Sequence, residues 1–248
     1  MDQPPAPPRR RAPLALVAAA CVLAAAAAAL AWGGLKLHDA SMGRRLMQLM
    51  PDETLKHREL VRFAVAQGRP LYLRHCAACH GPDLKGRSAI GAPNLVDRVW
   101  LYGDKGVFGI ERTVLYGARS QHWKSHNVTE MPAFGLRGQL RDADIANVVQ
   151  YLLQLSRRPH DAQAAELGKT VYYGPAACYD CHAQDAQGND DYGAPDLTAN
   201  VWNYGGDVRA LHDSVYYGRH GVMPAQIGKL SLEQIRAVSI YVYTASHH

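Results

Sequence analysis

The sequence lacks the features of several common protein classes. Its 27 Lys and Arg residues form no dense stripe with interleaved aromatic side chains, which a nucleic-acid-binding surface requires. No segment shows the alternating apolar and polar residues of a β-strand. Cysteines are few, and four of the five fall in two pairs separated by only two residues, whereas a disulfide framework spaces them more widely. These absences favour an all-α chain that binds no nucleic acid.

Charge is missing altogether from one segment near the N-terminus. No charged residue occurs from Ala12 to Leu35, a run of 24 residues made mostly of Ala, Leu and Val. At about 1.5 Å per residue, a helix of this length crosses a hydrocarbon core of about 30 Å. We therefore expect a single membrane anchor at 12–37, after a tail at 1–11. A cleaved signal peptide is the alternative, although its apolar region is usually shorter, roughly 7–15 residues.

What the chain does contain is an internal repeat. Two Cys-x-x-Cys-His motifs begin at Cys76 and Cys178, at an offset of 102 residues. Each is followed by a Gly-Ala-Pro segment and then by a Met-Pro-Ala segment, which begins at Met131 in the first copy and at Met223 in the second. The offset of the Met segments falls to 92 residues because the first copy has a longer loop before its methionine. Self-similarity of this kind predicts two copies of one structural unit.

Cys-x-x-Cys-His is the attachment signature of c-type haem. The two cysteines form thioether bonds to the porphyrin, and the adjacent histidine becomes the proximal ligand of the iron. Zinc is the alternative, but three ligands in a row suit a planar ring better than a tetrahedron. The sequence therefore predicts two covalently bound haem c groups. The expected attachment residues are Cys76, Cys79, Cys178 and Cys181, and the expected proximal ligands are His80 and His182.

The repeated methionines are the best candidates for the sixth iron ligand. Met131 and Met223 are each followed by proline, which stiffens the loop that presents the sulfur. A thioether ligand raises the reduction potential of the iron. The competing ligands are His122 or His126 in the first half and His220 in the second. Iron held by His and Met has no free position for substrate, so electron transfer is favoured and no catalytic residue is expected.

Other side chains have expected supporting roles. Pro93 and Pro195 are expected to leave a backbone carbonyl free to accept the ring N–H of each proximal histidine. Several aromatic and basic residues recur in both copies, and each is a candidate for contact with the haem edge or its propionates. The alternative is ordinary core packing for the aromatic residues and a solvated surface charge for the arginines. These residues are Trp100, Trp202, Tyr102, Tyr204, Arg119 and Arg219.

The repeat and the haem motifs together predict the organisation of the chain. The expected fold is all-α, with two tandem small cytochrome c domains after one N-terminal transmembrane helix. The domains are expected at 68–156 and 164–248, joined by a linker at 157–163 and preceded by a connecting helical segment at 38–67. A short helix is expected after the glycine at the start of each copy. Bacteria attach haem outside the cytoplasmic membrane, so we expect an inner-membrane protein with a cytoplasmic tail and periplasmic haem domains.

From Gly68 to Tyr243 the sequence resembles subunit III of cbb(3)-type cytochrome c oxidases, the C family of haem–copper oxidases. The most specific segments are 91–95, 130–135 and 218–225, and the unequal Met loops also fit. The family's Asn-Asn-Pro-Leu-Pro segment before the anchor is absent, and prolines and arginines stand there instead. The resemblance implies one haem held by Cys76, Cys79, His80 and Met131, and the other by Cys178, Cys181, His182 and Met223.

The resemblance also implies a function and partners. The chain would be an electron-transfer subunit, non-catalytic by itself, of a cytochrome c oxidase complex. It would take electrons from a soluble or membrane cytochrome c and pass them toward a catalytic haem–copper subunit, beside a monohaem cytochrome c subunit. The alternatives are a free-standing membrane-anchored dihaem shuttle and a cytochrome subunit of another respiratory complex. A dihaem peroxidase needs an open iron position, which the repeated Met-Pro segments argue against.

Overall fold

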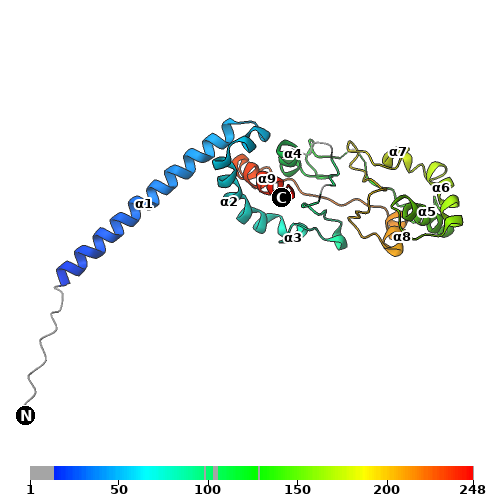
Figure 1. Cartoon of the computed structure of the whole chain (residues 1–248), viewed down its shortest axis with the longest axis horizontal. Helices are drawn as coiled ribbons and strands as arrows, with labels where there is room; N and C mark the ends of the chain where they lie inside the picture. The colour runs from blue at the N-terminus through cyan, green and yellow to red at the C-terminus, as the bar shows by residue number, and fades with distance from the viewer. Residues whose placement is uncertain (1–13, 98, 103–105, 128, 248) are drawn as a thin grey trace, which may run out of the picture. The chain divides into compact units, whose positions relative to one another are not determined.

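The computed structural model describes residues 14–97, 99–102, 106–127 and 129–247, and the expected tail at 1–11 lies outside them. Within these residues the regular structure is helical, with isolated β-bridges and no strand, which confirms the all-α expectation. Figure 1 shows the elements in chain order. They are α1 (Leu14–Gln48), η1 (Asp52–Lys56), α2 (Arg58–His75), α3 (Ala77–His80), η2 (Ser88–Ile90), α4 (Val107–Tyr116), α5 (Asp142–Leu155), α6 (Ala162–Tyr173), α7 (Tyr179–His182), α8 (Val208–Tyr217) and α9 (Leu232–Ser246).

Helix α1 contains the one candidate membrane span in the described part of the chain, at Leu16–Gln48. Between Leu16 and Leu37 its large apolar side chains are exposed, including Leu23 and Leu30. The helix continues past residue 37, where the expected span ends, so the first part of the expected connecting segment at 38–67 is a continuation of α1. The chain divides into two compact units after Arg45, and the second unit runs from Leu46 to His248.

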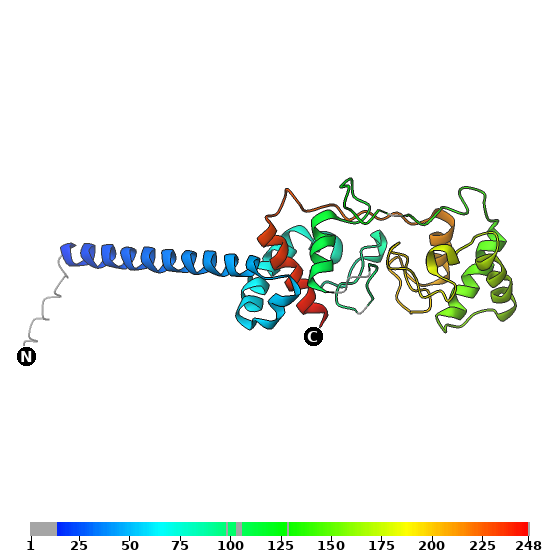
Figure 2. The same ribbon diagram turned by 90° about the horizontal axis from the view of Figure 1, so that it is seen from above.

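In this second unit the helices form two groups. The first module contains α2, α3, α4 and α9, and the second module contains α5, α6, α7 and α8. In both views α9, the last helix of the chain, lies beside α2 and α4 (Figures 1 and 2). We call the last helix of each sequence copy its closing helix: α5 in the first copy and α9 in the second. The packing differs from the expected domains at 68–156 and 164–248, because each closing helix packs with the other half of the sequence. The second module is continuous in sequence, whereas the first is built from both ends of the unit.

Both modules use the same close helix crossing. Gly68 lies inside α2 and Gly168 inside α6, rather than before a helix as expected. A Cβ at Gly68 would collide with the backbone of Ala237 in α9, and a Cβ at Gly168 would collide with that of Asn147 in α5. Glycine is needed at both points because the two helix backbones touch there. The exchange of closing helices thus preserves the packing of each module.

The chain passes from the first module to the second between α4 and α5, and it returns between α8 and α9. These crossing segments are joined by backbone hydrogen bonds at two positions. The N–H groups of Ala118 and Met223 donate to each other's carbonyl oxygens at 3.0 and 2.9 Å, and those of Met131 and Arg219 do so at 3.0 and 3.1 Å. Each methionine is therefore fixed by the segment that runs in the opposite direction.

A buried ion pair ties the start of the second unit to the first module. Arg236 of α9 pairs with Glu111 of α4, and their side chains are only 7% and 12% exposed. The same guanidinium donates to the carbonyl oxygens of Leu46 and Leu49, at 3.2 and 2.9 Å. Asp52 accepts hydrogen bonds from two backbone N–H groups at the start of α4, which satisfies donors that a helix N-terminus leaves free. The last turn of α1 and the segment after it are therefore held by α4 and α9.

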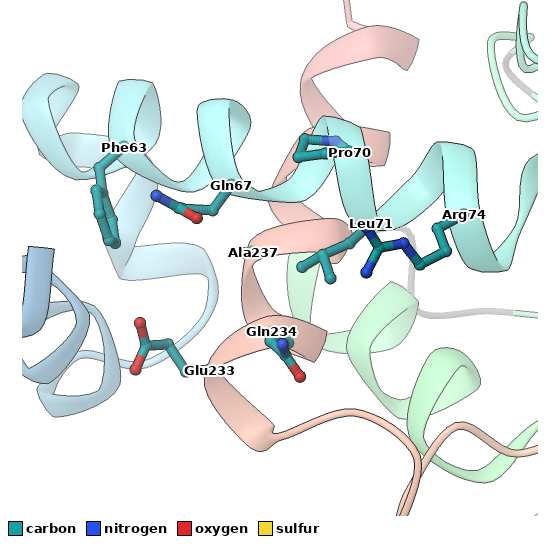
Figure 3. A pocket seen from close by; sticks show the side chains of 8 residues that line it. All are labelled: Phe63, Gln67, Pro70, Leu71, Arg74, Glu233, Gln234 and Ala237. Atoms are coloured by element: carbon teal, nitrogen blue, oxygen red, sulfur yellow. The ribbon is translucent and has the colours of Figure 1, made fainter.

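A cavity of about 220 Å³ lies between α2 and α9. Figure 3 shows Phe63, Leu71 and Arg74 projecting from α2, with Glu233 of α9 facing them. None of the expected haem residues lines this cavity, so it is separate from the candidate site.

Replacing Arg236 by methionine should lower the free energy of unfolding by about 3–5 kcal/mol, because Glu111 would remain buried without its partner. The matched control is the double variant Arg236→Met with Glu111→Leu, which removes both charges and should recover most of the loss. The measurement is the midpoint of urea unfolding of the detergent-solubilised chain, monitored by circular dichroism. Equal midpoints for the single and double variants would show that the unpaired charge of Glu111 does not cause the loss of stability.

Replacing Gly117 by alanine should destabilise the chain more than replacing Gly138 by alanine. Both glycines have positive φ angles, 75° and 63°, and an alanine held at a positive φ costs about 1–3 kcal/mol. A Cβ at Gly117 would also meet the carbonyl of Met223, whereas nothing lies within 4 Å of a Cβ at Gly138. Overpacking should add about 1–3 kcal/mol, measured as the difference between the two urea midpoints. A difference of zero would mean that the crossing segments adjust freely.

Candidate haem sites

The two cysteine motifs fold in the same way. α2 leads directly into Cys76 and the single turn α3, and α6 leads through a short turn into Cys178 and α7. The Nδ1 atom of His80 lies 3.2 Å from the carbonyl oxygen of Pro93, and that of His182 lies 2.9 Å from the carbonyl oxygen of Pro195. These contacts confirm the expected role of the two prolines. Because a carbonyl only accepts, each Nδ1 carries the proton and each Nε2 keeps its lone pair for a metal.

The electrostatics of both sites favour neutral donors. Burial lowers the pKa of His80 and of His182, and the hydrogen bond to the proline carbonyl offsets part of this shift. Burial also raises the thiol pKa of Cys76 to about 11, helped by the neighbouring Cys79, and that of Cys178 to about 12. Burial thus keeps both thiols neutral at pH 7 and places them against the apolar core, where a porphyrin ring would lie.

Nor do the motifs gather into a bare metal-ion site. Among the residues that the structure describes, no three His, Cys, Asp or Glu side chains converge as such a site requires. All five cysteines lie in this part of the chain, and none of them forms a disulfide there. Each motif instead presents its cysteines and its histidine from one short turn, beside the apolar core of its module. This donor set fits a porphyrin that brings four further ligands to the iron.

A buried tyrosine supports each motif and was not identified in the sequence. Tyr72 is fully buried, and its hydroxyl donates to the carbonyl oxygen of Gly81 at 2.6 Å. Tyr172 is equally buried and donates to the carbonyl oxygen of Ala183 at 2.9 Å. Each acceptor directly follows the proximal histidine, so the hydroxyl fixes the chain where it leaves the motif. The available signal was a tyrosine shortly before the first cysteine of each copy, although the spacing differs between the copies.

The structure exchanges the two methionines between the motifs. Met223 packs against the core of the first module together with Cys76. Met131 packs against the core of the second module together with Cys178. The expected pairing, with Met131 beside the first motif and Met223 beside the second, is therefore reversed. The reason is that each methionine directly precedes a closing helix and enters the same module as that helix.

The competing histidines have other surroundings. The ring of His126 stacks on Tyr102 with centroids 4.0 Å apart, and its Nε2 atom lies 3.2 Å from the hydroxyl of Thr113. Burial, reinforced by the positive charge of Arg112, lowers the pKa of His126. His122 stacks on a tyrosine of α4, and His220 is exposed on the returning segment.

The repeated aromatic and basic residues are engaged by protein groups. Trp100 packs against the first core and Trp202 against the second. The Nε atom of Arg119 donates to a backbone carbonyl at 2.6 Å, and that of Arg219 donates to the hydroxyl of Ser214 at 3.0 Å. Neither arginine is the freely solvated charge that the sequence left open.

Known proteins resemble this chain over both halves. A family model described as Cytochrome c matches residues 65–156, and one described as Cytochrome C oxidase, cbb3-type, subunit III matches residues 163–242. These matches follow the sequence repeat rather than the two packed modules. The chain is 38% identical to the Cbb3-type cytochrome c oxidase subunit CcoP of Cereibacter sphaeroides, over 74% of this chain and 62% of that protein.

A second relative is matched over more of its length. The Cbb3-type cytochrome c oxidase subunit FixP of Azorhizobium caulinodans is 36% identical, over 83% of this chain and 68% of that protein. FixP of Bradyrhizobium sp. ORS 278 is 39% identical over 76% of this chain and 63% of its own length. The match with the Cereibacter and Bradyrhizobium proteins thus spans less than two thirds of their length. Together with the two helical haem-motif modules, these matches show that the chain belongs to the subunit III (CcoP/FixP) family of cbb3-type cytochrome c oxidases.

Proposed function

We propose that the chain carries two covalently bound haem c groups and transfers electrons as a subunit of a cbb3-type cytochrome c oxidase. The observation that carries the proposal occurs twice. In each motif the histidine is oriented by a proline carbonyl that leaves Nε2 free, and a Met-Pro segment enters the same core. In the described part of the chain, the cysteines and histidine of a motif do not converge on one point as a bare ion requires, and a haem iron would explain the repeated site.

The proposed ligand sets follow the packing rather than the sequence order. Cys76 and Cys79 would attach the first haem, and His80 and Met223 would hold its iron. The second haem is held in the same way by residues from both halves of the chain. Its proposed attachment and axial residues are Cys178, Cys181, His182 and Met131.

The haem irons, when bound, supply reversible one-electron oxidation and reduction. The protein's part is to hold the ligands and to exclude water. The carbonyls of Pro93 and Pro195 keep each proximal ring in one tautomer and one orientation, which also tunes the metal it binds. The methionine sulfurs favour the reduced iron and fill the position that a substrate would need. No side chain is assigned a catalytic step, so the proposed role is conduction of electrons.

We further propose the setting in which this occurs. α1 anchors the chain in the bacterial inner membrane, and the unit from Leu46 onward lies in the periplasm, where haem is attached. Electrons enter from a soluble or membrane cytochrome c and leave toward a catalytic haem–copper subunit, with a monohaem cytochrome c subunit as a neighbour. The names of the relatives support this setting, since they are subunits of cbb3-type oxidases.

The test of function is purification of the tagged chain from native membranes in mild detergent, followed by a pyridine haemochrome spectrum. We expect two c-type haems per chain together with co-purifying b-type haem and oxygen consumption with reduced cytochrome c. Recovery of c-type haem alone, with no partner subunits, would instead support a free-standing dihaem shuttle. A chain without covalent haem would overturn both.

The exchange of methionines predicts a crossed effect of mutation. In a chain with Cys178→Ala and Cys181→Ala, only the haem of the first motif remains attached. Adding Met223→His should abolish the methionine-to-iron charge-transfer band of this haem and lower its reduction potential. Adding Met131→His is the matched control and should leave both unchanged. The reverse result would restore the pairing that follows the sequence order.

A further inference from the structure

Two glycine loops lie between the modules, one beside each proximal histidine. Gly91 and Gly193 stand two residues before the prolines that orient His80 and His182, and their φ angles are 67° and 64°. Each glycine leaves space that is filled by a tyrosine ring from the opposite module. A Cβ at Gly91 would overlap the ring of Tyr204, and one at Gly193 would come within 2.5 Å of the ring of Tyr102. The contact is therefore reciprocal.

The two tyrosines are themselves held by the crossing segments. The guanidinium of Arg219 lies over the ring of Tyr204, 4.2 Å from its centroid, and a cation in this position is attracted by the ring face. Because the backbone of Arg219 pairs with Met131, this ring is tied to the methionine of its own module. The guanidinium of Arg119 lies 3.5 Å from the hydroxyl of Tyr102. Both rings are thus in contact with an arginine of a crossing segment.

A third glycine connects the two tyrosines. The carbonyl oxygen of Gly221 accepts the hydrogen bond from Nε of Arg119 at 2.6 Å. A Cβ at Gly221 would lie 2.6 Å from the hydroxyl oxygen of Tyr204. The series Tyr102, Arg119, Gly221 and Tyr204 is therefore continuous, with no gap in packing between the two loops.

We propose that Tyr102 and Tyr204 are crossed positioning residues for electron transfer between the two haem sites. Each tyrosine belongs to one module but supports the loop that orients the proximal histidine of the other. The inference rests on the haem ligation proposed above. Groups that orient a metal-bound histidine tune the metal, so each ring influences the site across the interface.

The same contacts form a continuous path between the sites. From His80 the path runs through the carbonyl of Pro93 to Gly91 and then to the ring of Tyr204. Two residues before this tyrosine, Trp202 packs against the core that contains Cys178. A second path of the same kind runs from the other proximal histidine through Tyr102. Electron transfer between buried centres slows steeply where packing is broken, so each ring also keeps this path filled.

The test uses the full-length chain with both haems attached. Tyr204→Ala should alter the electron paramagnetic resonance spectrum and the reduction potential of the first-motif haem, while the second-motif haem stays as in the wild type. Tyr102→Ala should do the reverse. Transfer between the haems after photoreduction should be slower than in the wild type in either variant, because the contact between the two loops is lost. Assignment of each signal comes from Met223→His and Met131→His, which mark the two haems separately.

Conservative variants and a control separate positioning from general damage. Tyr204→Phe and Tyr102→Phe keep the ring and should retain the wild-type spectra and rate. Tyr217→Ala removes a half-exposed tyrosine of α8 whose ring packs edge-on against Tyr216, and this variant should change neither the spectra nor the rate. If an alanine variant loses haem, the leucine variant, which keeps apolar volume without the ring, takes its place.

The outcomes distinguish this inference from the function on which it rests. Fewer than two c-type haems in the wild-type chain would overturn the proposed ligation itself. The crossed role alone would be overturned in two cases, both with two haems attached. In the first, the alanine variant changes the spectrum and reduction potential of only the haem in the tyrosine's own module. In the second, it changes neither the spectra, nor the potentials, nor the transfer rate.

Discussion

The haem-binding unit depends on the pairing of its two crossing segments. Hydrogen bonds join Ala118 to Met223 and Met131 to Arg219, and each pair fixes the point at which a methionine enters a core. Buried backbone groups must keep their partners, so neither methionine can shift without leaving donors and acceptors unsatisfied. Gly117 and Gly218, which precede these pairs, let the two crossing segments approach closely. The position of both methionines, the proposed sulfur ligands, therefore depends on the pairing between the crossing segments.

This arrangement gives the two sides of each proposed haem site different origins. The cysteines and the proximal histidine come from one half of the sequence, together with the proline carbonyl that orients the ring. The methionine comes from the other half, together with the helix that closes the core. Neither half alone contains a complete site. The buried pair of Arg236 and Glu111 adds a further long-range tie, since it joins α9 to α4 and to the segment after α1. These ties explain why Leu46–His248 behaves as one compact unit.

The same interface brings the two proximal loops into contact with groups from the opposite module. Gly91 and Gly193 admit aromatic rings because they carry no Cβ, and the rings are held by arginines that belong to the crossing segments. A chain that carries electrons needs its centres close together and firmly placed, because no substrate diffuses between them. Shared crossing segments meet this need better than a flexible linker would. The residues that join the two modules are thus the ones that would keep the two proposed haem sites close together and in fixed positions.

The sequence by itself determined the chemistry of each site. Two Cys-x-x-Cys-His motifs, two prolines and two Met-Pro segments could be found by local spacing, because the residues that act together on the proximal side are neighbours in the chain. It also determined the helical fold and the apolar run of α1. It could not decide which methionine and which closing helix serve which motif. The two copies carry the same glycine crossings and similar apolar faces, so α5 and α9 fit either module on local grounds. Only the tertiary structure decides, because backbone pairing between the crossing segments, which has no signature in the sequence, directs each closing helix to the opposite half.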